Sequence, residues 1–246
     1  MTHSGRETAL SKALQSGRWL PGTFLARLDP AVREGLLGLG GHRTLRSGEP
    51  LTRQGDRGTD VFLLKGTATG GACAKVTRLV PNGSESLLGI RVVGDVIGEG
   101  AALRDDRTRS ATVTACADLV AQVVERRRFL QYLDRNPAAW RALCALISER
   151  LDWANRRRLD FAAYEVRTRL VRVVLELVEA HGVRGPLGVE LGVEVSQQEL
   201  GRLIGAKPDT VGTALRALKA EGLITARYRG LFIRDLDALR RVADEG

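Results

Sequence analysis

Short strand-like runs separated by glycines occupy the sequence from His42 to about Val124. The runs are Val61–Leu64, Ala74–Val80, Ser86–Val93, Ala111–Thr114 and Leu119–Val124, and Pro81-Asn82-Gly83-Ser84 is a hairpin signal between two of them. Many short strands at regular spacing, joined by glycine turns, are typical of a β-barrel or jelly roll. This segment therefore predicts a closed β domain in the first half of the chain.

The strand pattern stops after Val124, and helical periodicity replaces it. A short helix is expected over Arg127–Asp134, and Pro137 then opens a long helix, because proline is accommodated in a first helical turn. Seam positions recur there at steps of four and three: Trp140, Cys144, Ile147, Leu151, Ala154, Arg158 and Phe161. This spacing favours a dimer seam, although a single helix packed on the β domain would give a similar stripe.

The last third of the chain predicts two helices followed by a hairpin. Tyr164–Ala180 continues as helix, and His181–Leu191 is a glycine-rich connection. Ser196-Gln197-Gln198-Glu199 has the form of a capping box, so a helix begins there and ends at Gly205. Pro208 starts a second helix, and two short strands follow around Arg229-Gly230. Helix, glycine turn, helix and hairpin form a winged helix-turn-helix.

The stretch Gly98–Thr112 gathers groups suited to a cyclised phosphate and its ribose. Its Gly-Glu-Gly step lets backbone N–H groups approach an anion without an intervening Cβ. Glu99 offers an acceptor for a sugar hydroxyl, Arg109 a planar fork for phosphate oxygens, and Ser110 a hydroxyl donor beside it. The alternative is a surface ion pair of Arg109 with Asp105 or Asp106, with Glu99 as a strand-end charge.

Composition limits the classes of partner and activity. The net charge of +9 favours a polyanionic partner, although the arginine runs at 126–128 and 156–158 could equally be solvated helix faces. No apolar run approaches a membrane span, and the polar N-terminus lacks a signal peptide, so we expect a cytoplasmic protein without a membrane partner. The cysteines and histidines are scattered, which predicts no metal site and no catalytic residues, and hence not an enzyme.

With these motifs in place, residues from about 30 to 235 resemble the cyclic AMP receptor protein family of bacterial transcription regulators. The resemblance implies an α+β fold: an N-terminal β jelly roll or double-stranded β-helix barrel, a long dimerisation helix and a C-terminal winged helix-turn-helix. The expected divisions are an N-terminal extension over 1–25, a cyclic-nucleotide-binding-like barrel over 26–135, the dimerisation helix over 136–164 and a DNA-binding domain over 165–246.

The resemblance also implies a ligand site. In it Glu99 takes the ribose 2′-hydroxyl and Arg109 with Ser110 the cyclic phosphate, while Leu88 and Gly89 line the sugar side. The full set is Leu88, Gly89, Gly98, Glu99, Gly100, Ala101, Arg109, Ser110 and Asn155. Ala154 and Asn155 replace the family's base-binding hydroxyl residues, and Gly100 replaces a bulkier apolar one. We therefore expect a cyclic nucleotide effector, cAMP or cGMP, with altered base discrimination.

The implied DNA partner is a pseudo-palindromic duplex bound by a homodimer, with RNA polymerase as a further partner. The predicted contact residues are Ser196, Gln197, Lys207, Pro208, Asp209, Thr210, Thr213, Arg216, Arg227 and Arg229. Gln197, Thr210, Arg227 and Arg229 are expected to contact phosphates. Pro208, Asp209 and Thr213 stand where the family reads bases with two arginines and a glutamate, so a different target sequence is expected.

The sequence thus predicts a homodimeric transcription regulator in which a nucleotide biases a hinge near Phe161–Val166. One alternative is a constitutive DNA-binding regulator whose barrel has lost nucleotide binding or binds a different effector. A nucleotide-responsive enzyme or its regulatory subunit is the other, and the chain leaves no room for a catalytic domain.

Overall fold

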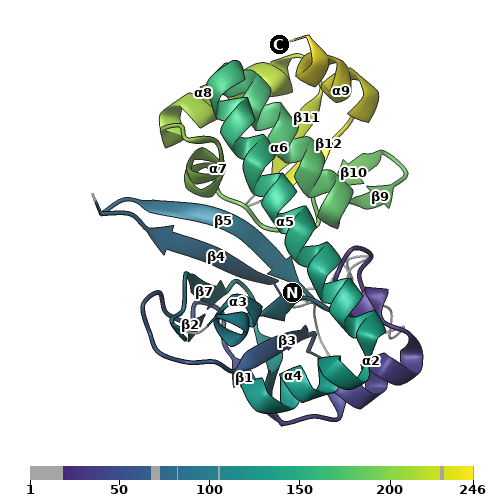
Figure 1. Cartoon of the computed structure of the whole chain (residues 1–246). Coiled ribbons are helices and arrows are strands. Elements are labelled where there is room, and N and C mark those ends of the chain that lie inside the picture. Colours follow the sequence, from purple (N-terminus) through teal and green to yellow (C-terminus); the bar gives the residue numbers. More distant parts are fainter. Residues whose placement is uncertain (1–18, 68–72, 82, 105, 228–229, 246) are drawn as a thin grey trace, which may run out of the picture. The chain divides into compact units, whose positions relative to one another are not determined.

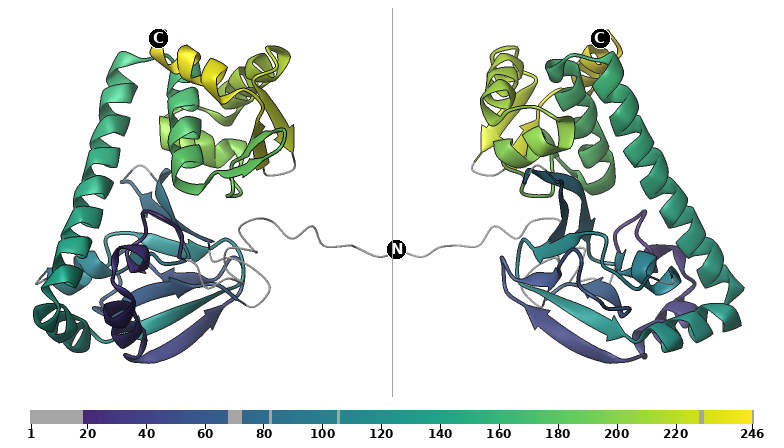
Figure 2. Two further views of the ribbon diagram at one scale, coloured as in Figure 1. Left: turned by 90° about the vertical axis from the view of Figure 1, so that its right-hand side faces the viewer. Right: turned by 60° about the vertical axis from the view of Figure 1, so that its left-hand side comes forward.

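The computed structural model describes residues 19–67, 73–81, 83–104, 106–227 and 230–245. Internal contacts divide the chain into two compact units, residues 1–150 and 151–246. The division falls inside the long helix α5 (Pro137–Ala163), which is drawn as one unbroken element in Figure 2. Each unit is described separately.

Two antiparallel sheets of four strands form the first unit, as predicted for a β domain. One sheet has the order β1-β8-β3-β6 and the other β2-β7-β4-β5. Figure 1 labels the four strands of the latter sheet. The strands are β1 (Gly41–Leu45), β2 (Pro50–Thr52), β3 (Val61–Lys65), β4 (Cys73–Leu79), β5 (Glu85–Val92), β6 (Val96–Ile97), β7 (Thr112–Ala115) and β8 (Leu119–Val124). The helical elements are η1 (Leu25–Arg27), α2 (Pro30–Leu37), α3 (Glu99–Leu103) and α4 (Arg126–Arg135).

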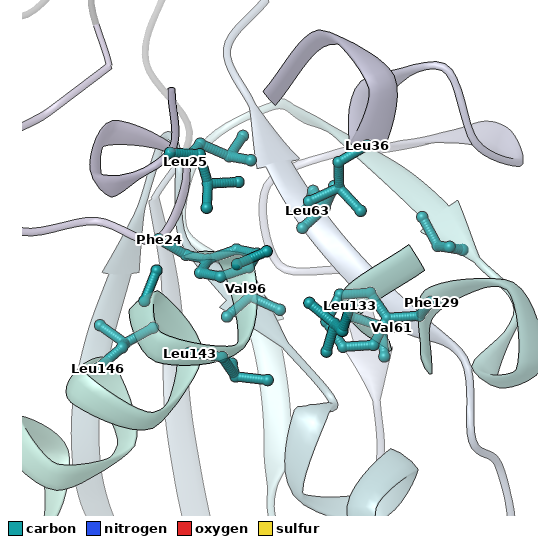
Figure 3. Close-up of a cluster of buried hydrophobic side chains, with 14 of the residues drawn as sticks. Phe24, Leu25, Leu36, Val61, Leu63, Val96, Phe129, Leu133, Leu143 and Leu146 are labelled. Atoms are coloured by element: carbon teal, nitrogen blue, oxygen red, sulfur yellow. The ribbon is translucent and has the colours of Figure 1, made fainter. Parts of the chain in front are cut away.

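An apolar cluster joins the helices of this unit to the β1-β8-β3-β6 sheet. Phe24 and Leu25 are fully buried in it, beside Val61 and Leu63 of β3 and Phe129 of α4 (Figure 3). The sequence-based division had placed Phe24 and Leu25 in the N-terminal extension. Their burial means that the core between the helices and this sheet uses the residues just before α2.

The first half of α5 has two different faces. Ala139, Ala142, Leu143 and Leu146 pack into the same apolar cluster. The predicted seam is a separate stripe: Cys144 is exposed, Ile147 is 36% exposed, and Leu151 and Phe161 are 59% and 60% exposed. Trp140, the first seam position, packs against the apolar cluster, so the alternative of a helix packed on the β domain holds at that position. The dimer seam stays a prediction for the exposed positions.

The second unit combines helices with one four-stranded sheet in the order β11-β12-β10-β9. Its elements after α5 are α6 (Val166–His181), β9 (Val183–Gly185), β10 (Gly188–Glu190), α7 (Gln197–Ile204), α8 (Pro208–Ala220), β11 (Ile224–Arg227), β12 (Gly230–Ile233) and α9 (Leu236–Asp244). The predicted helix-turn-helix and hairpin are confirmed. The expected connection over His181–Leu191 is partly wrong, because β9 and β10 lie within it and β10 pairs with β12.

The capping box at the start of α7 is also confirmed. Ser196 Oγ accepts from the Glu199 N–H at 3.2 Å, and Glu199 Oε2 accepts from the Ser196 N–H at 2.8 Å. Gly205 ends α7 in the left-handed region with φ of 64°, which glycine adopts without a Cβ penalty. These local signals determine where the two helices begin and end.

Candidate functional site

A cavity in the first unit contains most of the predicted ligand residues. Its open space, including its mouth, is about 480 Å³. The predicted residues that line it are Gly98, Glu99, Gly100, Ala101, Arg109 and Ser110, joined by Thr52, Val76, Arg91, Val96, Ile97, Ala111, Val113 and Arg150. Leu88 and Gly89 are not among the lining residues, and Asn155 belongs to the second unit.

Arg109 is the most buried charged group of the cavity, with 7% of its surface exposed. Its Nη2 donates to the Asp60 carbonyl at 2.9 Å, and its guanidinium carbon lies 5.3 Å from the centre of the Phe62 ring. Its Nη1 is buried and has no hydrogen-bond partner among the described residues. A buried donor without an acceptor costs about 1–3 kcal/mol, so this atom is prepared to receive an anionic oxygen.

Burial lowers the pKa of Arg109, while the carboxylates of Asp60, Glu99 and Asp56 favour its charged form. The ion pair that sequence reasoning held as an alternative does not form with Asp106, because Asp106 pairs with Arg104 at 3.3 Å. Asp105, the other alternative partner, lies outside the described residues. Arg109 is therefore turned into the protein.

Gly98 is required by the packing of Arg109. Its φ is +85°, and a Cβ at this position would lie against Arg109 Nη1 and 2.7 Å from the Asp60 carbonyl oxygen. The residues after it form the short helix α3, whereas the sequence predicted a turn. The glycine thus permits close approach of the backbone to the Arg109 guanidinium. The sequence had instead predicted that its backbone N–H would approach an anion.

Glu99 is held by an arginine that sequence reasoning missed. Arg150 Nη1 donates to Glu99 Oε1 at 2.7 Å, and its Nη2 donates to Asp95 Oδ1 at 3.3 Å and to the Val96 carbonyl at 3.1 Å. These side chains are 10–19% exposed. Arg150 lies one helical turn after Leu146, on the face of α5 that packs on the sheets, and that spacing was the available signal.

Arg91 is the second missed arginine, on β5. Burial lowers the pKa of Arg91 to about 10; the positive charge of Arg150 acts in the same direction, and Asp95 and Glu99 oppose it. It remains protonated at neutral pH. Its Nη1 donates to the Ile90 carbonyl at 3.0 Å and would lie 2.9 Å from a Cβ at Gly89. Gly89 therefore makes room for an arginine of the cavity instead of lining the cavity itself.

The predicted DNA-contact residues gather at α7 and α8. Gln197, Lys207, Pro208, Asp209, Thr210, Thr213 and Arg216 are exposed, while Ser196 is half-buried and its hydroxyl is engaged by Glu199 at 2.8 Å. Arg216 Nη2 donates to Thr213 Oγ1 at 2.9 Å, which in turn donates to the Asp209 carbonyl at 3.1 Å. Arg229 and the side chain of Arg227 lie outside the described part. Each of these DNA contacts stays a prediction.

Two further features of the described residues bear on the class of protein. None of the described helices is long and apolar enough to cross a membrane. The described residues also contain no cluster of three His, Cys, Asp or Glu side chains that could hold a metal ion.

Two protein-family models match the chain in the order of its units. Residues 42–136 match the cyclic nucleotide-binding domain, and residues 168–242 match the Crp-like helix-turn-helix domain. A CRP-like cAMP-activated global transcriptional regulator of Mycobacterium tuberculosis is 26% identical over 203 residues, which cover 82% of this chain and 85% of the relative.

Solved structures agree at the level of fold. The c-di-GMP responsive global regulator CLP of Xanthomonas campestris superposes with a TM-score of 0.71 at 22% identity, covering 84% of this chain and all of that one. FixK2 of Bradyrhizobium japonicum gives 0.70 at 18% identity, covering 83% of this chain and 97% of its own.

Proposed function

The chain belongs to the CRP family of bacterial DNA-binding transcription regulators, and on that premise we propose that it is a homodimer whose binding to a specific DNA site is controlled by a cyclic nucleotide in the cavity of the first unit. The finer parts of this proposal are the effector, the dimer and the DNA contacts, and each has its own support and its own test.

The buried, incompletely bonded guanidinium of Arg109 is the observation that supports a phosphate ligand. A cyclic phosphodiester carries one negative charge and two free oxygens, which suit the unpaired Nη1 of Arg109 and the exposed hydroxyl of Ser110. Relief of an unsatisfied buried donor adds to the charge attraction. An apolar ligand would leave this donor unpaired, and a neutral sugar would leave the charge of the guanidinium without a counter-charge.

Glu99 supports the ribose part of the proposal. Arg150 holds one carboxylate oxygen of Glu99, Oε1, at 2.7 Å, so the other is available to accept from a hydroxyl. The ion pair fixes the orientation of the carboxylate before the ligand arrives, and this reduces the ordering cost of binding. Because α5 contributes Arg150, a ligand at Glu99 would also contact the helix that presents the seam.

Calorimetry of the full chain with cAMP and cGMP tests the effector. We expect saturable binding of at least one of them, and Arg109→Gln should weaken binding of every cyclic nucleotide alike. Arg104→Gln is the matched control, because Arg104 is exposed and pairs with Asp106 at the surface. Absence of heat and of any thermal shift at millimolar ligand would contradict the proposal and leave the constitutive regulator as the function.

The dimer is proposed from the outward stripe of α5. Ile147, Leu151 and Phe161 expose apolar surface on one helix at the spacing of a coiled-coil seam. A second copy of the same helix would cover this stripe by two-fold symmetry. Helix α5 ends at Ala163 and α6 begins at Val166, so the break between them falls in the predicted hinge.

The exposed start of α8 supports major-groove recognition by this helix. Two copies would read half-sites about one helical turn, ~10 bp, apart. Footprinting of genomic fragments at ~0.15 M salt, with and without cyclic nucleotide, tests this. A protected pseudo-palindrome that strengthens with ligand is expected; protection that ignores sequence would argue against it. Contact with RNA polymerase at the bound site is part of the same proposal.

A further inference from the structure

The effector cavity contains one cation more than the ligand proposed above requires. Asp95 and Glu99 pair with Arg150, and Arg109 is assigned to the phosphate. Arg91 lines the same cavity and has no carboxylate within ion-pair distance among the described residues. Its hydrogen bond to the Ile90 carbonyl uses Nη1, which leaves the rest of the guanidinium fork for a ligand.

Contacts between these residues give the order of groups across the cavity. Arg109 donates to the Asp60 carbonyl and packs against Gly98, the residue before Glu99. Arg150 joins Glu99 to Asp95. Asp95 Oδ2 in turn accepts from the N–H of Val92, the residue after Arg91. The contacts therefore run from Arg109 past Glu99 to Arg91.

In a nucleotide the sugar separates the phosphate from the base. If Arg109 holds the phosphate and Glu99 the ribose, as proposed above, the base falls at the Arg91 end of the cavity. Arginine is a donor without an acceptor, and its fork matches the O6 and N7 acceptors of guanine. Adenine presents N7 beside an N6 amino donor, which would face another donor.

We propose that Arg91 reads the base edge of the effector, and that the cavity selects a guanine cyclic mononucleotide over the adenine one. This inference rests on the proposed function, since it assigns the base subsite of the same cavity. Gly89 contributes to this base-binding arrangement, because the absence of a Cβ leaves space for the Arg91 guanidinium beside it.

The experiment titrates the full chain with three cyclic nucleotides: those of guanosine, adenosine and inosine. Inosine keeps O6 and N7 but lacks the exocyclic amine, so it isolates the edge that Arg91 would contact. One good bidentate contact gives about tenfold to hundredfold discrimination. We expect guanosine and inosine cyclic phosphates to bind with similar affinity, and the adenosine compound more weakly by this factor.

Variants assign the effect to Arg91. Arg91→Leu should remove the preference by weakening the guanine ligand about tenfold to hundredfold while leaving the adenine ligand nearly unchanged, and Arg91→Lys should lose most of it because the fork is gone. Arg78→Leu is the matched control, since Arg78 is an exposed arginine of the neighbouring strand β4. Thermal melts confirm folding of each variant.

The outcomes separate the two proposals. If no cyclic nucleotide binds, the proposed function itself fails. If nucleotides bind but adenine is equal or preferred, or if Arg91→Leu weakens all three ligands equally, the base assignment is overturned and the proposed function stands. Tighter binding of cyclic di-GMP than of cyclic GMP would also overturn it, because Arg91 would then serve a second phosphate.

A separate observation concerns two cysteines at one end of the β4 and β7 pair in the β2-β7-β4-β5 sheet. Ala74 lies opposite Ala115 in the antiparallel register of β4 and β7, so Cys73 lies opposite Cys116, whose N–H donates to the Cys73 carbonyl at 2.8 Å. Both are half-buried, and neither is in a disulfide. Opposite residues of such a hydrogen-bonded pair project to the same face with Cβ atoms about 5.5 Å apart. A disulfide needs a Cβ separation of about 3.5–4.5 Å, which a small local shift can supply.

The geometry points to Cys73 and Cys116 as a reversible oxidation site that a peroxide would use. The first thiolate attacks a peroxide oxygen and breaks the O–O bond, which gives a sulfenic acid and hydroxide. The second thiolate then attacks the sulfenic sulfur, forms the S–S bond and releases a second hydroxide; with the two thiol protons the products are a disulfide and two waters. The link would be strained and hence easily reduced.

The test treats a Cys144→Ser variant of the full chain with hydrogen peroxide. We expect loss of both remaining thiols, a mass decrease of two hydrogen atoms, a linked Cys73–Cys116 peptide and full recovery with dithiothreitol. Cys73→Ser in the same background is the control and should show no such mass loss. In the wild type, exposed Cys144 serves as an internal reference. Oxidation of Cys144 while the pair stays reduced, or gains oxygen without linking, would overturn the assignment.

Discussion

Substitution of Leu151 by aspartate probes the outward stripe of α5. Leu151 is 59% exposed within one chain. Full burial of a leucine side chain contributes about 1.5–3 kcal/mol, so covering its exposed part in a dimer contributes about 1–2 kcal/mol. Two-fold symmetry doubles this to about 2–4 kcal/mol. We expect Leu151→Asp to raise the dimer dissociation constant by about thirtyfold to a thousandfold.

The assay is sedimentation velocity over a concentration series, combined with thermal melts. Leu187→Asp is the matched control: it replaces a leucine that is 81% exposed and lies between β9 and β10, outside α5. Leu187→Asp should leave the oligomeric state unchanged. Leu151→Asp should dissociate the dimer with little change in monomer stability, since substitutions at exposed positions rarely exceed about 0.5 kcal/mol. An unchanged dissociation constant for Leu151→Asp would refute the seam.

Three further outcomes are expected. Gly98→Ala should lower cyclic nucleotide affinity in calorimetry by about 1–3 kcal/mol, because a positive φ and contact with the Arg109 guanidinium both oppose a Cβ; an unchanged affinity would show that Arg109 does not depend on this packing. Ser196→Ala should destabilise the second unit by about 0.5–2 kcal/mol in urea unfolding through loss of the α7 cap, with Gln198→Ala as a neutral control. Arg150→Leu should cost about 1–3 kcal/mol in unfolding free energy, because it leaves the Asp95 and Glu99 carboxylates partly buried without their partner; a loss no larger than that of Arg27→Leu, which breaks a more exposed pair, would contradict this.

Much of the fold could be predicted because its signals are local. The strands from Val61 to Val124 follow β-branched runs and glycine turns, and α8 begins at Pro208 as expected. The capping box at Ser196 involves residues three apart, so its geometry follows from the sequence alone. By contrast, β9 and β10 were missed because they are short and acquire their role by pairing with β12.

In the candidate site, too, some features follow from local sequence and others only from tertiary packing. The sequence by itself determined that Glu99, Arg109 and Ser110 lie near one another, since a single short segment carries them all. Only the tertiary structure decided that Arg109 turns inward to the Asp60 carbonyl, that Arg150 from α5 holds Glu99, and that Arg91 from β5 enters the same cavity. The first two of these contacts join residues 49 and 51 positions apart. They depend on strand register and on which face of a helix is buried, and both are decided by the packing of the whole unit.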